Sequence, residues 1–426
     1  MSLADGYGNT LTTRSAEARD HYESAVTLFL GANREGLAAF SHCVAADPQF
    51  ALGHVGLARA LMSAGRTSDA KDALKTAESL AFDVTSRERD HIAATGLVFS
   101  GQSAKARQAI RAHLSDHPRD VLLAQMCASV FGLIAFSGEA GHEASLLAFT
   151  ESLLPHYGED WWMMATHAVS LCETGQIAAS EVLMARSLAL NPRNANGAHF
   201  KSHALYERGE TTAGRQYLTT WVQDYDDRGV LHGHLNWHLA LWALHDGDEG
   251  AMWAILDGSV GPGASKGLPI NILTDTVAIL HRAEIAGYAV DPRRWTAASE
   301  YAAQYFPNPG QSFADLHAAI AHAMSGKGDR LARLAESSSG YAGDLLAPVS
   351  LAFGHIARGR WSDALDALVP VLPVAERFGG SRAQRDLVEL AYVNVLMKLG
   401  LVEEARRTLK TRRPVLSDAP PVSGLT

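Results

Sequence analysis

The 426-residue sequence contains little that is typical of β-sheets, membrane spans or disulfide frameworks. Segments of alternating β-branched residues are almost absent, no run of about 18 apolar residues occurs, and the three cysteines form no CxxC pair. The N-terminal residues lack the basic and apolar regions of a signal peptide. We therefore expect a cytoplasmic protein that has reduced thiols and does not insert into a membrane.

Sequence motifs of several common enzyme classes are also missing. We find no serine nucleophile elbow, P-loop or Rossmann glycine fingerprint, and no HExxH motif of metalloproteases. The formal net charge of -9 gives no reason to expect a nucleic-acid partner. A hydrophobic content of 47% is that of a globular protein and argues against disorder.

The sequence does contain an internal repeat. Residues 52–80 fit the tetratricopeptide pattern, with small residues at Ala58, Ala70 and Ala77 and with Gly65 at the turn. In this pattern small residues let two helices approach closely, and glycine allows the turn between them. Further matches follow along the chain at Gly175, Ser180, Met184, Ser187 and Pro192, at Gly359, Ala364 and Leu368, and at Gly400, Ala405 and Leu409.

Helical periodicity places the first helix of each repeat at a regular interval of about 33–42 residues. The expected starts are near residues 15, 50, 86, 119, 159, 195, 231, 269, 311, 345 and 383. This predicts an all-α, right-handed α-solenoid of about eleven tetratricopeptide-like hairpins. We expect a flexible segment over residues 1–14, one continuous array over 15–412 with a loop at 258–269, and a disordered tail over 413–426.

Three pairs of histidines occur at i, i+4 spacing, which places both members of a pair on one face of a helix. His199 and His203 lie in HFKSH, and His234 and His238 lie in HLNWH. These two pairs fall on the first helices of consecutive repeats, so we expect the four imidazoles to meet on the concave face. The third pair, His113 and His117, we interpret as a surface pair at a helix end.

The four histidines at this position have three interpretations. They could be ligands of a divalent metal such as zinc, because imidazole is a common ligand and a pair one helical turn apart is a known arrangement. They could form a metal-free polar site for acid–base chemistry, or they could serve only the structure. The sequence leaves these alternatives open.

At this point the chain resembles a known family. The two histidine pairs, together with Glu173 in ETG, DLH at residues 315–317 and GGSRAQRD at 379–386, are similar to the tetratricopeptide repeat protein 38 family. The similarity extends over about residues 15–410. It implies a tetratricopeptide-like fold and supports the candidate site, whereas it implies no particular reaction.

Other polar residues recur on neighbouring first helices. Asp275 and His317 are further catalytic candidates, because a carboxylate near an imidazole can orient the ring or tune its pKa. For Asp315 and Glu173 a role in the site competes with helix capping or a salt bridge. Tyr206 and Trp237 are candidate substrate contacts, although aromatic residues are more often found in helix–helix contacts.

The GGSRAQRD segment predicts a helix that begins behind Gly379, Gly380 and Ser381. Free N–H groups at such a start favour an anion, and Arg385 could bind a carboxylate or phosphate with two hydrogen bonds. Gln384 and Asp386 would lie beside it. The alternative is a Ser381 cap and an ion pair between Arg385 and Asp386.

Together these residues predict a compact polar pocket on a repeat scaffold. We expect an enzyme or binder of a small polar or acidic molecule that uses general acid–base chemistry, with metal assistance as one possibility. The alternative is a non-catalytic scaffold that binds a partner protein or a second copy of the chain. Metal content and the enclosure of the site distinguish the two.

Overall fold

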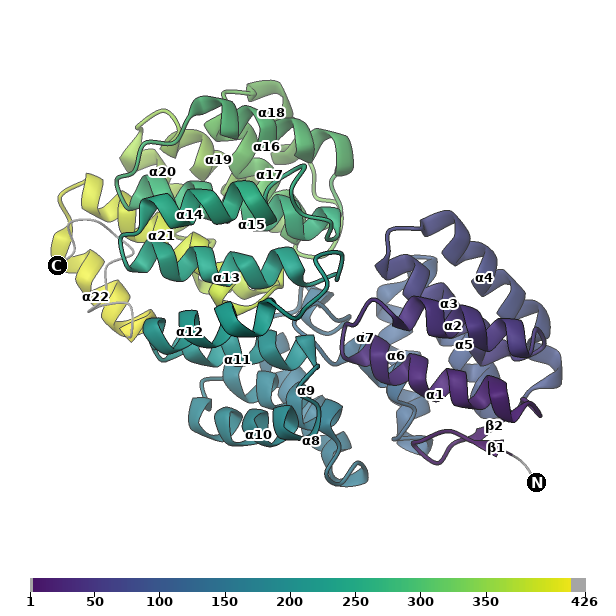
Figure 1. Cartoon of the computed structure of the whole chain (residues 1–426). Coiled ribbons are helices and arrows are strands. Elements are labelled where there is room, and N and C mark those ends of the chain that lie inside the picture. Colours follow the sequence, from purple (N-terminus) through teal and green to yellow (C-terminus); the bar gives the residue numbers. More distant parts are fainter. Residues whose placement is uncertain (1–2, 415–426) are drawn as a thin grey trace. The chain divides into compact units, whose positions relative to one another are not determined.

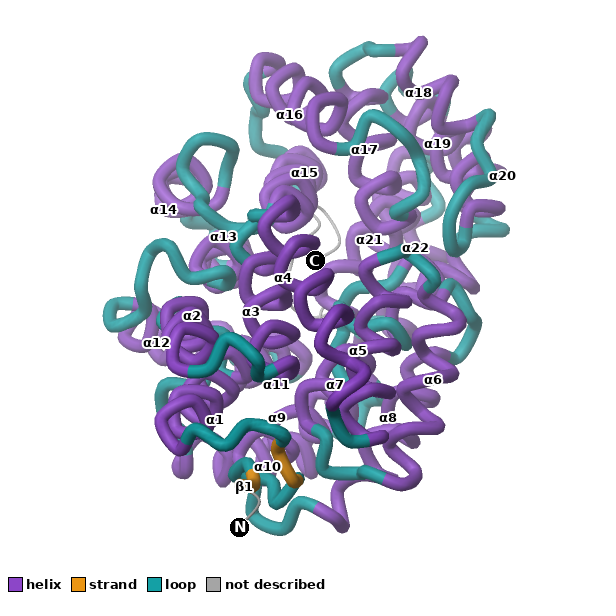
Figure 2. Tube along the Cα trace, turned by 90° about the vertical axis from the view of Figure 1, so that its right-hand side faces the viewer, coloured by secondary structure: helices purple, strands orange, loops and turns teal. Residues whose placement is uncertain are grey.

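The computed structural model describes residues 3–414 and is all-α, apart from two short paired strands (Figures 1 and 2). The strands are β1 (Leu3–Ala4) and β2 (Thr10–Leu11). The helices of unit length are α1 (Ala16–Leu30), α2 (Gly36–Ala46), α3 (Ala51–Ser63), α4 (Thr67–Leu80), α5 (Ser86–Phe99), α6 (Ser103–Asp116), α7 (Val121–Cys127), α8 (His142–Leu153), α9 (Trp161–Glu173), α10 (Ile177–Leu190), α11 (Ala195–Glu207), α12 (Thr211–Val222), α13 (His232–His245), α14 (Glu249–Ile255), α15 (Pro269–Ile285), α16 (Pro292–Tyr305), α17 (Ser312–Met324), α18 (Gly328–Ala335), α19 (Leu346–Ile356), α20 (Trp361–Leu368), α21 (Arg382–Lys398) and α22 (Val402–Arg412).

These helices alternate as the first and second members of hairpins. Odd-numbered helices begin within about two residues of the starts expected from the repeat, and α1 packs on α2, α3 on α4, α9 on α10 and α19 on α20. The predicted tetratricopeptide-like solenoid is therefore confirmed as the fold class.

The α3–α4 hairpin shows why the repeat residues are needed. Ala58 and Ala70 are fully buried in one cluster between the two helices, so a larger side chain would push the helices apart, and Ala77 is fully buried in the core of unit 1. Gly65 in the turn has a φ of 74°, a conformation that costs other L-residues about 1–2 kcal/mol. The local sequence thus fixes both the spacing and the direction of the hairpin.

Contacts between Cα atoms divide the chain into two compact units. Unit 1 contains residues 1–135, 143–201 and 228–231, and unit 2 contains residues 136–142, 202–227 and 232–426. The boundary falls within α11, which runs as one unbroken helix. Each unit has its own large hydrophobic core.

In unit 2 the helices follow a curved path that brings late hairpins back to early ones. α15 packs on α13 and α17, as neighbouring first helices do, and α17 packs on α19. α21 packs on α15 as well, although two further first helices lie between them in the chain. This return places residues of α21 beside residues of α15.

Three segments differ from the simple expectation. Residues 3–11, assigned to a flexible N-terminus, contain the β1–β2 pairing of Leu3 with Leu11. The 258–269 loop is shortened because a π-helical turn runs over Leu256–Val260 and α15 begins at Pro269. In the C-terminal tail Arg413 is buried and paired, while residues 415–426 lie outside the described part of the chain.

Membrane insertion can be examined for the described helices alone. None of the helices within residues 3–414 is long and apolar enough to span a bilayer.

Candidate metal centre

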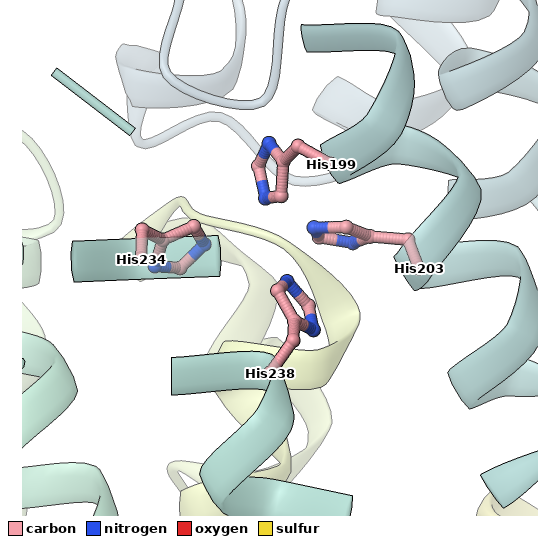
Figure 3. A group of neighbouring side chains, drawn as sticks. All are labelled: His199, His203, His234 and His238. Atoms are coloured by element: carbon pink, nitrogen blue, oxygen red, sulfur yellow. The ribbon is translucent and has the colours of Figure 1, made fainter. Parts of the chain in front are cut away.

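Two helices hold the four histidines of the predicted site. His199 and His203 lie one turn apart on α11, and His234 and His238 lie one turn apart on α13. All four side chains point toward a common centre (Figure 3), and each residue is no more than 2% exposed. The i, i+4 spacing therefore places two imidazoles from each helix in one buried site.

The four rings are close enough to share one ion. Each imidazole offers a ring nitrogen, and the four nitrogens all lie within 4.8 Å of one another. The ring centroids of His203 and His238 are 5.0 Å apart, and those of His234 and His238 are 5.2 Å apart. A set of four neutral nitrogen donors suits zinc, copper, nickel or iron and does not suit magnesium or calcium, which prefer oxygen.

A carboxylate on α15 orients one of the rings. The two Asp275 oxygens lie 2.8 and 3.0 Å from His234 Nδ1. When Nδ1–H donates to Asp275, the lone pair of His234 lies on Nε2, and the imidazole becomes a stronger ligand. This carboxylate–histidine pair has the arrangement typical of metal sites.

Burial shifts the pKa values of His238 and Asp275 in opposite directions. Burial, together with the neighbouring His203 and His234, holds the pKa of His238 well below its ordinary value. Burial raises the pKa of Asp275, although His234 and Arg282 partly oppose this shift. Neutral imidazoles are the form that binds metal, and a dication among them would offset the cost of burying the Asp275 charge.

Two further candidates, Asp315 and His317, lie on α17. Asp315 is buried, and its Oδ2 accepts a hydrogen bond from the Gly310 N–H at 2.9 Å, so it caps the start of the helix. Burial raises the pKa of Asp315 to about 6. His317 is also buried, with Nδ1 2.7 Å from the Phe313 carbonyl oxygen, and burial lowers its pKa to about 4.

Two side chains at the start of α21 form hydrogen bonds with the free N–H groups of that helix end. Ser381 accepts from the Gln384 N–H, while Gln384 Oε1 accepts from the Ser381 N–H at 3.0 Å. This capping box uses donors that a bound anion would need. Arg385 Nη1 donates to the Gly380 carbonyl oxygen.

Asp386 is bound by residues outside α21, whereas the alternative interpretation of this segment paired it with Arg385. Its Oδ2 instead accepts from Tyr206 Oη at 2.8 Å and from Arg413 Nη2 at 2.7 Å. Tyr206 therefore donates to a protein carboxylate. Both residues belong to a buried network that ties α11 to α21.

The remaining candidates are buried in helix contacts. Glu173, at the end of α9, is 3% exposed. Trp237 is fully buried, and its ring stacks on His234 with centroids 5.0 Å apart and an interplanar angle of 13°.

A second buried polar cluster occupies unit 1, and it corrects the prediction for His113. Asp120 accepts from Arg87 Nη1 at 2.7 Å and from His113 Nε2 at 3.0 Å, and it lies 2.9 Å from His91 Nδ1. His113 is therefore buried and paired instead of lying on the surface. The i, i+4 spacing to His117 gave no sign of this, because the partner of His113, Asp120, lies in the turn after the helix.

The sequence patterns did not identify Arg282 as a candidate site residue. It lies near the end of α15, is 2% exposed, and has its guanidinium carbon 5.8 Å from the centre of the Trp237 ring. A single arginine on an apolar helix is the only signal that could have indicated it.

The fold places the chain among tetratricopeptide-like helical repeat proteins. No protein-family model matches the sequence. Among solved structures, the chain is similar to a human IFIT1 dimer with m7Gppp-AAAA, at 12% identity and a TM-score of 0.44, over 95% of this chain and 89% of the other. It is also similar to the P58(IPK) TPR domain, at 14% identity and a TM-score of 0.22, over 93% of this chain and 99% of that one. A third similarity is to the Naa15/Naa10 structure bound to HypK-THB, at 13% identity and a TM-score of 0.25, over 95% and 64% of the two chains.

Proposed function

We propose that this chain binds a divalent transition-metal ion and uses the site to act on a small polar or acidic molecule. The ligands are His199, His203, His234 and His238. The observation that supports this most strongly is the convergence of four buried ring nitrogens within 4.8 Å. A buried carboxylate, Asp275, also orients His234, as supporting carboxylates do for the histidine ligands of many metal sites.

The nature of the ion would decide what the site can do. Four imidazoles saturate a tetrahedral zinc ion, which is the arrangement of a structural site. An ion that accepts five or six ligands would keep positions for water and for a polar substrate atom, and would supply a Lewis acid there. We propose this second arrangement, in which the neutral histidines hold the ion and Asp275 keeps the His234 tautomer.

Two further assignments belong to this proposal. The motifs HFKSH, HLNWH and GGSRAQRD support membership of the tetratricopeptide repeat protein 38 family. The three free, buried cysteines support a reducing compartment such as the cytoplasm.

The test is the metal content of untagged protein. We expect elemental analysis to find close to one transition-metal ion per chain, or calorimetry to show uptake of one such ion by the chelator-treated protein. Replacing one ligand on each helix, His199→Ala with His238→Ala, should abolish this binding while circular dichroism shows the helical content unchanged.

A surface histidine pair provides the control. The rings of His21 and His42 lie 5.5 Å apart on α1 and α2, and His21→Ala with His42→Ala should leave the metal content as it was. A protein that neither carries nor takes up metal would contradict the proposal and favour the interaction scaffold.

A further inference from the structure

The buried guanidinium of Arg282 uses few of its donors. Nη2 donates to the Ala383 carbonyl oxygen at 2.8 Å, and Nη1 lies 3.3 Å from the Ala278 carbonyl oxygen. Nε has no partner, and within residues 3–414 no carboxylate forms a salt bridge with this group. A guanidinium has five N–H donors, so most of the hydrogen-bonding capacity is unused.

An unpaired charge in this position is unfavourable for the fold. Burial lowers the pKa of Arg282, and Asp275 and Asp386 oppose this only from a distance. Arg413 shows the contrast, because it is buried too but binds both Glu207 and Asp386. Buried charges in proteins are normally paired, and a group without a protein partner is suited to pair with a ligand.

The two helices that contact Arg282, α13 and α21, also carry buried donors without a partner. Trp237 on α13, whose ring lies next to the guanidinium, has no partner for its Nε1–H and is fully buried. Gln384 on α21 follows the residue that Arg282 contacts, and its Nε2 also has no partner at 2% exposure. Three helices thus contribute N–H groups that no acceptor of the described chain satisfies.

We propose that Arg282, Trp237 and Gln384 bind the carboxylate group of a small acidic molecule. A planar carboxylate accepts hydrogen bonds at both oxygens and carries the single negative charge that one guanidinium balances. A phosphate dianion fits less well, because Asp275 and Asp386 already place negative charge around Arg282.

This subsite adjoins the histidine cluster. Trp237, which contacts Arg282 on one side, stacks on His234, and Asp275 pairs with the same histidine. The inference rests on the proposed function for the reaction, since it names a carboxylate-bearing molecule as the substrate class. The binding itself needs no metal and can be measured without it.

The experiment titrates chelator-treated, full-length protein with acetate, succinate and benzoate. Acetamide, succinamide and inorganic phosphate serve as comparison probes, and calorimetry and thermal melting are the readouts. We expect at least one carboxylate to bind and raise the melting temperature, while its amide and phosphate do not. Arg282→Met should weaken carboxylate binding at least tenfold, and Trp237→Phe, which removes only the N–H and part of the ring, should weaken it severalfold.

Two controls keep the outcome decisive. Arg59 in unit 1 is a buried arginine that donates to the Leu122 carbonyl and to Gln125, so Arg59→Met should leave carboxylate binding unchanged. If Arg282→Met does not fold, Trp237→Phe and Gln384→Leu decide the question through the same titration.

The two proposals fail in different ways. Metal uptake without any effect of the carboxylates, or equal carboxylate binding in the wild type and in the Arg282, Trp237 and Gln384 variants, overturns the subsite. Carboxylate binding that depends on Arg282 in a protein that takes up no metal overturns the metal centre and leaves the subsite standing.

Discussion

At the scale of single residues, the contact between His234 and Asp275 determines which ring nitrogen can act as a ligand. Asp275 accepts a hydrogen bond from Nδ1–H, so the lone pair of His234 is held on Nε2. Asp275 also places a negative charge beside the four histidines. A substitution of Asp275 should therefore lower the affinity for metal more than it lowers the stability of the fold.

We predict that Asp275→Asn weakens metal binding by about 10–100-fold, the usual effect of losing such a supporting carboxylate. The amide has no charge to stabilise the bound ion, and it can donate as well as accept. The measurement is a competition titration against a chelator of known affinity. Asp315→Asn is the matched control, because Asp315 is a buried acid of unit 2 that caps a helix and contacts no ligand histidine; equal losses in both variants would argue for a general effect on the fold.

At the scale of elements, Arg413 fastens the end of α22 to two other helices. Its Nη1 and Nη2 lie 2.9 and 3.0 Å from the Glu207 oxygens, and Nη2 is 2.7 Å from Asp386 Oδ2. Glu207 ends α11, whose preceding turns carry His203 and His199. The last helix of the array is thereby tied to the helix that holds half of the metal ligands.

Arg413→Ala should destabilise the protein by about 3–5 kcal/mol, because it leaves buried carboxylates without their cation. Chemical denaturation gives the loss of stability, and hydrogen exchange should show α22 losing protection first. Arg406→Ala on the same helix breaks only the exposed pair with Glu403 and should cost less than about 1 kcal/mol. Similar costs for the two variants would show that the buried network contributes little.

The positions of the helices could be predicted from sequence because they depend on local features. Turn glycines such as Gly65 and buried alanines such as Ala58 recur along the chain, and they act within one repeat. The number of hairpins followed from the spacing alone. The end of the 258–269 loop and the short β1–β2 pairing were missed, since neither belongs to the repeat.

Only part of the candidate site could be predicted in this way. The four histidines were found because their spacing and their place on successive first helices are visible in the sequence. The contact of Arg282 with Ala383 and that of Tyr206 with Asp386 join helices that are far apart in the chain. Such contacts follow from the small rotation between successive hairpins, which the repeat pattern does not specify.

At the scale of the whole molecule, the fold buries many histidines in their neutral form. Burial lowers the pKa of His281 to about 3 and those of His317 and His322 to about 4. In the unfolded chain these groups take up protons near the ordinary pKa of about 6.5. Between these values the unfolded state binds more protons than the folded state, so stability must fall as the pH falls.

We predict that these histidines make the metal-free protein progressively less stable from about pH 6.5 to pH 3, with little further change from these groups below that window. Each of the three histidines contributes on the order of a few kcal/mol at most. Thermal melting followed by circular dichroism across this range is the measurement. His322→Gln should flatten the profile, whereas His42→Gln at an exposed site should not alter it; a melting temperature independent of pH would contradict the prediction.

The packing of α21 against α15 limits how this protein can change during evolution. In an open solenoid each hairpin touches only its neighbours, so duplication or loss of a repeat leaves the others intact. Here Arg282 reaches Ala383 across 101 residues, and Tyr206 reaches Asp386 across 180 residues. One additional hairpin between them would separate these partners, so the number of repeats after α11 is fixed while loops and single residues remain free to vary.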